Sequence, residues 1–162
     1  DALVPLQIVA EPIQILIDAD ACPVKDETYK VALRHQVPVT LVSNSFLRVP
    51  AHPLIKHVTV SDGFDAADDH VVELATASSV VVTADILLAE RALKEGAIVL
   101  GPNGKPFTED SIGGAIATRA IMSDLRAGGD QVGGAAPFSK ADRSRYLSAL
   151  DEALNRLKRA AR

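Results

Sequence analysis

Short apolar runs alternate along the chain with longer segments of mixed polarity. Each run is nearly continuous and rich in Val, Ile and Leu, which is typical of strands buried on both faces of a parallel sheet. Turn residues such as Gly and Pro lie between several of the runs. The pattern predicts five strands, at residues 13–17, 37–43, 56–60, 80–83 and 97–100.

The segments between the predicted strands carry residues that are typical of helix boundaries. Pro23 suits the first turn of a helix, and Gly96 suits a helix end. Ser139 followed by Asp142 resembles a capping pair. The sequence therefore predicts helices at residues 23–36, 65–77, 86–95, 108–126 and 139–160.

Strands that alternate with helices indicate an α/β fold with a largely parallel sheet. We expect residues 1–162 to form a single domain. Within it we expect a core at residues 13–126, a glycine-rich loop at 127–138 and a C-terminal helix at 139–160.

The composition is that of an ordinary globular protein, with 48% hydrophobic, 23% charged and only 4% aromatic residues. The single cysteine, Cys22, excludes an internal disulfide and fits a reducing compartment. No apolar run approaches the roughly 20 residues that span a bilayer, and the apolar start is cut by Pro5 without a preceding basic segment. We therefore expect a cytoplasmic protein with no signal peptide and no membrane partner.

The charge is negative overall but unevenly distributed. The net charge of −4 argues against a protein that coats nucleic acid non-specifically. Residues 140–162 nevertheless carry seven basic and three acidic side chains. This asymmetry fits an acidic metal site beside a basic surface that grips phosphate, although a solvated helix would show the same pattern.

Aspartates gather where the predicted strands end. Asp18 and Asp20 follow the first strand, and Asp85 follows the fourth. Asp65 and Asp68 stand at the start of the helix after the third strand. Because the carboxyl ends of parallel strands meet at one edge of the sheet, where ligands of such folds bind, we expect these side chains to lie together.

A structural alternative exists for three of these acids. Asp is a favoured helix N-cap, and Asp20, Asp65 and Asp85 each precede a predicted helix. Asp18 instead ends an apolar strand, where a carboxylate is costly unless it is paired or bound to metal. Converging carboxylates repel one another unless a cation lies among them. Oxygen ligands without a set of His or Cys favour Mg²⁺ or Mn²⁺ over zinc.

Several motifs closely resemble those of the bacterial YaiI/YqxD family, and the resemblance covers about residues 13–146. They include Asp18-Ala-Asp-Ala-Cys-Pro23, Leu47-Arg-Val-Pro50, Gly63-Phe-Asp65 and Thr83-Ala-Asp85. That family is grouped with PIN-like domains, which are largely Mg²⁺- or Mn²⁺-dependent nucleases. The resemblance implies a three-layer α/β/α fold with a mostly parallel central sheet of about five strands.

The resemblance also implies a function, namely metal-assisted hydrolysis of phosphodiesters in nucleic acid, with RNA favoured. The implied metal ligands are Asp18, Asp65, Asp68 and Asp85, and the implied catalytic residues are Asp18, Asp20 and Asp85. PIN-like enzymes often carry Glu at the position that Asp65 or Asp68 occupies here. The candidate substrate-binding residues are Asn44, Arg48, Lys25, Thr83 and Arg119. The sequence is also compatible with a homo-oligomer.

Two other functions stay open at the level of sequence. The first is a module of the same fold that binds metal or nucleic acid without cutting it. The second is a haloacid-dehalogenase-like phosphatase with Asp18 as nucleophile and Asp20 as acid. The phosphatase is a poor match, because Cys22 and Pro23 follow the second aspartate and no acid pair follows a later strand.

Overall fold

The computed structural model describes residues 11–61, 63, 65–114, 116 and 137–161. Six strands form one sheet in the order β3-β2-β1-β4-β5-β6. The strands are β1 (Gln14–Asp18), β2 (Val39–Ser43), β3 (Ile55–Thr59), β4 (Ser79–Val82), β5 (Ile98–Leu100) and β6 (Pro106–Phe107). The first five strands pair in parallel, and β6 pairs antiparallel with β5. The predicted α/β fold with a mostly parallel sheet is therefore confirmed.

The five predicted strands lie within two residues of their observed ends, whereas the sixth strand was missed. A turn at residues 102–104 follows β5, and β6 lies between this turn and the next helix, which starts at residue 109. The strand is two residues long and begins with Pro106. Proline cannot donate to a sheet ladder and is tolerated at an edge, which is where β6 lies.

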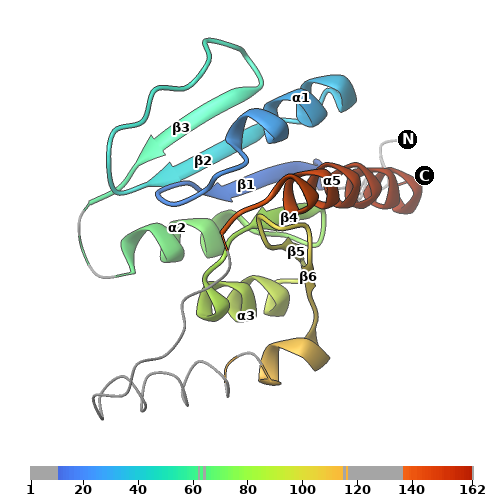
Figure 1. The fold of residues 1–162 in the computed structure, drawn as a ribbon. Coiled ribbons are helices and arrows are strands. Elements are labelled where there is room, and N and C mark those ends of the chain that lie inside the picture. The colour runs from blue at the N-terminus through green and yellow to red at the C-terminus, as the bar shows by residue number, and fades with distance from the viewer. Residues whose placement is uncertain (1–10, 62, 64, 115, 117–136, 162) are drawn as a thin grey trace, which may run out of the picture.

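Helices cover both faces of the sheet, as Figure 1 shows. They are α1 (Lys25–His35), α2 (Ala66–Leu74), α3 (Ile86–Lys94) and α5 (Lys140–Ala160), with further helical residues at 109–114 and 116. One apolar cluster joins α1 and α5 to one face, and a second joins α2 and α3 to the other. Side chains of a strand point alternately to its two faces, so Ile15 and Ile17 enter the first cluster and Leu16 enters the second. The arrangement is three-layered.

Two predicted features extend beyond the described residues, and one predicted helix ends earlier than expected. The helix expected at 108–126 is helical at 109–114 and 116, and its remainder lies outside the described part of the chain. Most of the expected glycine-rich loop at 127–138 also lies outside it. The helix expected at 65–77 is shorter in the structure, because α2 ends at Leu74. None of the described helices is long and apolar enough to cross a membrane.

The long helix α5 is held firmly against the rest of the domain. Its capping pair is confirmed, since Ser139 and Asp142 each accept a hydrogen bond from the other's backbone N–H. Gly104, at a φ of 83°, lies so close to α5 that a Cβ there would collide with the backbone of Arg145. The buried hydroxyls of Tyr146 and Thr28 hydrogen-bond at 2.6 Å and link α5 to α1. These contacts fix the start of α5 beside the turn after β5.

The strand order reverses between β1 and β4. From β1 the chain moves outward through β2 to β3, and it then returns to β4 on the other side of β1. In open sheets of this type, the crevice outside the carboxyl ends at such a reversal is the usual ligand site. The carboxyl end of β1 is Asp18, and β4 leads directly into Thr83 and Asp85.

Candidate active site

Asp18, Thr83 and Asp85 are joined by hydrogen bonds across the strand reversal. The Thr83 hydroxyl, 1% exposed, donates to Asp18 Oδ2 at 2.8 Å and accepts from the backbone N–H of Asp85 at 2.9 Å. Burial raises the pKa of Asp18, the Thr83 hydrogen bond opposes the rise, and the charges of Asp85 and Asp20 add to it. The buried Thr83 hydroxyl therefore fixes the Asp18 carboxylate and also the backbone that carries Asp85.

Asp85 is a helix cap, as the structural alternative proposed. Its Oδ1 accepts hydrogen bonds from the backbone N–H groups of Leu87 and Leu88 at 2.9 and 3.2 Å, at the start of α3. Among the described residues no hydrogen bond reaches its Oδ2. Capping therefore fixes this side chain but leaves one carboxylate oxygen for another partner.

Asp68, in the first turn of α2, has a strongly raised pKa because it is partly buried close to other acids. Burial raises its pKa to about 6, and the charges of Asp85, Asp18 and Asp65 add to the rise. Arg91 opposes it, but its guanidinium pairs with Asp69 at 2.9 Å. Asp68 thus feels both acids of the strand reversal, and no nearby cation balances it fully.

Asp65 occupies the N-cap position of α2 without acting as a cap. Its side chain makes no capping hydrogen bond, and its φ of 62° is left-handed. A non-glycine residue in that region is uncommon, and such strain is often found at functional sites. The cap interpretation is therefore wrong for the side chain of Asp65, whose charge adds to the pKa of Asp68.

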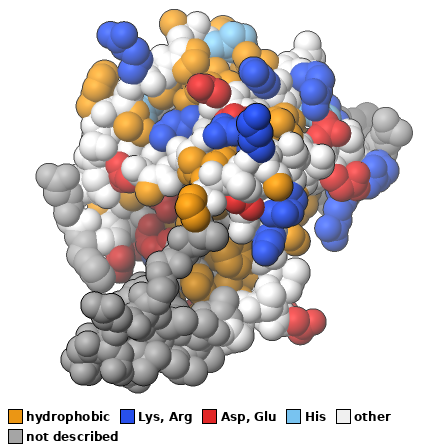
Figure 2. Space-filling model, in the orientation of Figure 1, with side chains coloured by type: hydrophobic (Ala, Val, Ile, Leu, Met, Phe, Trp, Pro, Cys, Tyr) orange, Lys and Arg blue, Asp and Glu red, His pale blue; other side chains and the backbone are white. Residues whose placement is uncertain are grey.

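Asp18, Asp65, Asp68 and Asp85 together form what we term the acid cluster. In the described part of the chain no group of three or more His, Cys, Asp or Glu side chains is placed so that it could hold a metal ion. The donors nevertheless suit Mg²⁺ or Mn²⁺, because all are carboxylate oxygens and described hydrogen bonds reach only Asp18 Oδ2 and Asp85 Oδ1. Figure 2 shows acidic side chains left of centre and others among the basic side chains on the right, while the basic ones spread over the upper and right-hand parts.

Asp20 differs from the acid cluster in its partners. Its Oδ2 accepts from the backbone N–H of Asn44 at 2.8 Å, and its Oδ1 accepts from the Ser45 hydroxyl at 2.9 Å. Burial tends to raise the pKa of Asp20, but these hydrogen bonds outweigh burial and hold the pKa below its usual value. The helix-cap interpretation is wrong here too, because the N-cap of α1 is Val24. Asp20 instead ties the loop after β2 to the end of β1.

The candidate substrate-binding residues do not lie together in one place. Asn44 is part of the loop structure, since its side-chain amide also donates to the backbone carbonyl of Ser61 at 2.8 Å. Lys25 and Arg48 line one hollow of about 360 Å³ beside Tyr29. Thr83 is buried beneath the acids, as described above. Arg119 lies outside the described residues.

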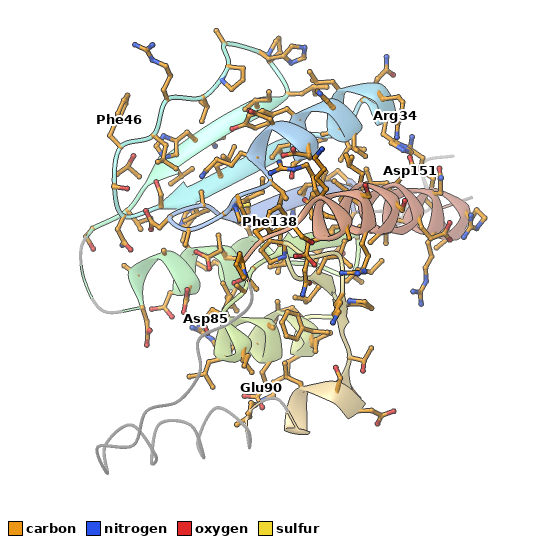
Figure 3. The ribbon with its side chains drawn as sticks, viewed as in Figure 1. Arg34, Phe46, Asp85, Glu90, Phe138 and Asp151 are labelled. Atoms are coloured by element: carbon orange, nitrogen blue, oxygen red, sulfur yellow. The ribbon has the colours of Figure 1, made fainter. Side chains whose placement is uncertain are left out.

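Sequence reasoning missed two features of this edge. Ser45 holds Asp20, and the next residue, Phe46, projects from the same loop with 83% of its surface exposed (Figure 3). A pocket of about 450 Å³ also opens beside Asp85, between the start of α5 and three loops. An aromatic residue in a polar loop was a visible signal for the first feature. The pocket had no local signal, because its walls come from distant segments.

Comparison with known proteins agrees with the motifs. A family model described as "Uncharacterized BCR, YaiI/YqxD family" matches residues 16–156. The chain belongs to the YaiI/YqxD family. It is 72% identical to a UPF0178 protein of Sphingopyxis alaskensis over 146 residues, covering 90% of this chain and 95% of the relative. A UPF0178 protein of Rhodopseudomonas palustris is 57% identical, with 90% and 92% covered. No solved structure matches the chain.

Proposed function

We propose that this protein is a Mg²⁺- or Mn²⁺-dependent phosphodiesterase that acts on nucleic acid, with RNA as the favoured substrate. The observation that carries the proposal is the acid cluster at the strand reversal, where the pKa of Asp68 rises to about 6. A carboxylate in a merely structural role, with a cation or hydrogen-bond donors as partners, would have its pKa lowered. The preference for RNA comes from the resemblance to PIN-like domains.

The acid cluster would hold one or two cations through Asp18, Asp85 and either Asp65 or Asp68. A cation bound there lowers the pKa of a bound water and offsets charge on the phosphate oxygens. Thr83 keeps Asp18 in place through its hydrogen bond, and the cap of α3 keeps Asp85 in place. The protein thus positions these ligands by bonds that do not depend on metal.

Asp20 supports the site by shaping its rim. With its pKa lowered, it stays ionised and holds the loop after β2 through Asn44 and Ser45. The hollow that Lys25 and Arg48 share offers two cationic side chains to a flanking phosphate. An ionised Asp20 is a poor general acid, which speaks against the phosphatase alternative.

A module that binds without cutting is the second candidate. Two observations favour it. Among the described residues no three His, Cys, Asp or Glu side chains are placed to hold a metal ion together, and the net charge of −4 predicts modest affinity for RNA. Both candidates share the acid cluster and differ only in whether bound RNA is cleaved.

A nuclease assay with Mn²⁺ on single-stranded and structured RNA separates the two. The phosphodiesterase should cut, and chelation by EDTA should stop it. Asp18→Asn should lower the rate by at least roughly a hundredfold, the usual scale for removing a charge-stabilising group. Glu90→Gln on α3 (Figure 3), which changes an acid outside the acid cluster by the same isosteric step, is the matched control and should leave the rate unchanged.

Three results would count against the phosphodiesterase. Metal-dependent binding without cleavage would favour the module. A covalent phosphate adduct at Asp18 would favour the phosphatase. Cleavage that survives Asp18→Asn unchanged would remove the acid cluster from the reaction.

A further inference from the structure

A pocket of about 450 Å³ is lined by both chain neighbours of Asp85, a member of the acid cluster. Its walls come from the loops after β1, β4 and β5, from β6 and from the start of α5. They are formed by Ala21, Pro23, Ala84, Ile86, Gly101, Pro102, Asn103, Phe107, Phe138 and Asp142. Ala84 and Ile86 flank Asp85 in the chain, so one wall of the pocket is continuous with the acid cluster.

The walls are largely apolar and include flat surfaces. Two aromatic rings, Phe107 and Phe138, and two proline rings, Pro23 and Pro102, line the pocket. Its volume lies in the range of sites for small organic ligands. The pocket therefore suits one planar, largely apolar group of moderate size.

The Phe138 ring, which lines the pocket, is contacted by an arginine of α5. The Arg143 guanidinium lies 5.1 Å from the centre of its ring, and Arg143 forms an ion pair with Glu27 of α1. Figure 3 shows Phe138 at the start of α5, above Asp85 at the start of α3. The ring thus contacts a side chain of α5 that is itself tied to α1, and it also packs against the first apolar cluster.

The polar groups of the pocket offer a hydrogen-bond donor and no free anion. Asn103 Oδ1 accepts from the backbone N–H of Lys105 at 3.0 Å, whereas Asn103 Nδ2 has no hydrogen-bond partner among the described residues. Both oxygens of Asp142 are occupied, by the Ser139 backbone and by Arg145. A ligand with an apolar ring and an acceptor at its edge would complement these groups.

We propose that this pocket takes a nucleobase of the nucleic-acid strand whose phosphate lies at the acid cluster. The proposal rests on the proposed function for its substrate class and adds the subsite that positions the strand. A nucleobase supplies the planar ring that stacks on Phe138 and the edge acceptor for Asn103 Nδ2. Base–aromatic stacking of this kind tolerates different bases, so the pocket would position the strand with little sequence preference.

Binding without cleavage provides the test. The probe is a short single-stranded RNA with one 2-aminopurine, whose fluorescence is quenched on stacking, titrated with protein in Ca²⁺, a cation that takes the same carboxylate oxygens, with the RNA checked on a gel to be intact. Phe138→Ala removes a wall, and Ala21→Leu fills the pocket from an exposed position. Each should weaken binding roughly tenfold, the loss expected for one stacked base. Phe46→Ala, the matched control, removes an exposed ring outside the pocket and should bind like wild type.

The outcomes separate this proposal from the proposed function. Wild-type affinity in both pocket variants, or an equal loss in Phe46→Ala, would overturn the pocket assignment. So would equal competition, against the fluorescent strand, by unlabelled strands with a base and with an abasic residue at the position of the 2-aminopurine. If Phe138→Ala fails to fold by circular dichroism, Ala21→Leu decides. Pocket-dependent binding without any Mn²⁺-dependent cleavage would contradict the phosphodiesterase alone, and Asp18-dependent cleavage that ignores both pocket variants would contradict the pocket alone.

Discussion

Two groups of charged side chains, at opposite ends of α1, differ in how their charges are balanced. At the carboxyl edge of the sheet, burial and neighbouring acids raise the pKa of Asp68 to about 6. Near the C-terminal end of α1, hydrogen bonds from His35 and Arg34 hold the pKa of Asp151 on α5 below its usual range (Figure 3).

The second group is a closed network. His35, only 9% exposed, contacts Asp151 through Nε2 at 2.6 Å and Lys158 through Nδ1 at 2.9 Å. Arg34 also pairs with Asp151, so this carboxylate has basic partners from α1 and ties α1 to α5. In the described part of the chain, none of the acids of the acid cluster forms an ion pair of this kind. One group is balanced by partners from the chain itself, whereas the other is the group that the proposed function assigns to a cation.

The largest expected difference between the two groups is their response to metal. Mn²⁺ at one hundred times its dissociation constant should raise the free energy of unfolding by about 2.7 kcal/mol, because it binds the folded acid cluster. Thermal unfolding with and without Mn²⁺ measures this. Asp18→Asn should lose most of the gain, while Asp151→Asn should keep it. Equal gains in both variants would show that the stabilisation by Mn²⁺ does not depend on the acid cluster.

The next effect is on the pH dependence of stability. Because the fold raises the pKa of Asp68, the folded state binds more protons than the unfolded state between pH 3.8 and about 6. Stability should therefore fall as the pH rises through this window. Asp68→Asn should remove that fall and, without metal at pH 7, raise the free energy of unfolding by about 1 kcal/mol, a value discounted for solvent screening.

Urea unfolding of wild type and Asp68→Asn at several pH values measures this effect. The matched control is Asp69→Asn, since Asp69 is the next residue and pairs with Arg91. A destabilised Asp68→Asn at pH 7 would show that Asp68 is a structural partner rather than a crowded acid.

The smallest effect is expected at the closed network. Asp151→Asn should lower the free energy of unfolding by less than about 1 kcal/mol at pH 7, since exposed ion pairs contribute little. The pKa of Asp151 is lowered in the fold, so its contribution is present above pH 3.8 and is lost as the pH falls through the folded pKa. Urea unfolding should therefore show wild type and Asp151→Asn converging at acid pH, and a difference that persists there would argue against ion pairing.

The fold was largely predictable because its signals are local. Apolar runs such as residues 13–17 and 80–83 mark buried parallel strands whatever their partners are. The strand β6 gave no such signal, since two residues that begin with Pro106 have no periodicity. Helix ends were less certain for the same reason, as α2 shows.

The candidate site was predictable only in part. Strand–helix alternation was enough to bring Asp18, Asp68 and Asp85 to one edge. It could not show that Asp20 turns to Asn44 and Ser45, 24 and 25 residues away, because that depends on how two loops meet. The same reason hid the pocket beside Phe138. The local sequence predicts where strands end and which acids follow them, whereas the partners of a side chain are set by tertiary packing.

A crystal soaked in Mn²⁺ and recorded for anomalous scattering would locate bound metal directly. We predict a peak among the carboxylates of Asp18, Asp68 and Asp85, with none beside Asp151. At millimolar Mn²⁺, no peak at the acid cluster while these side chains are ordered would rule out a cation site there.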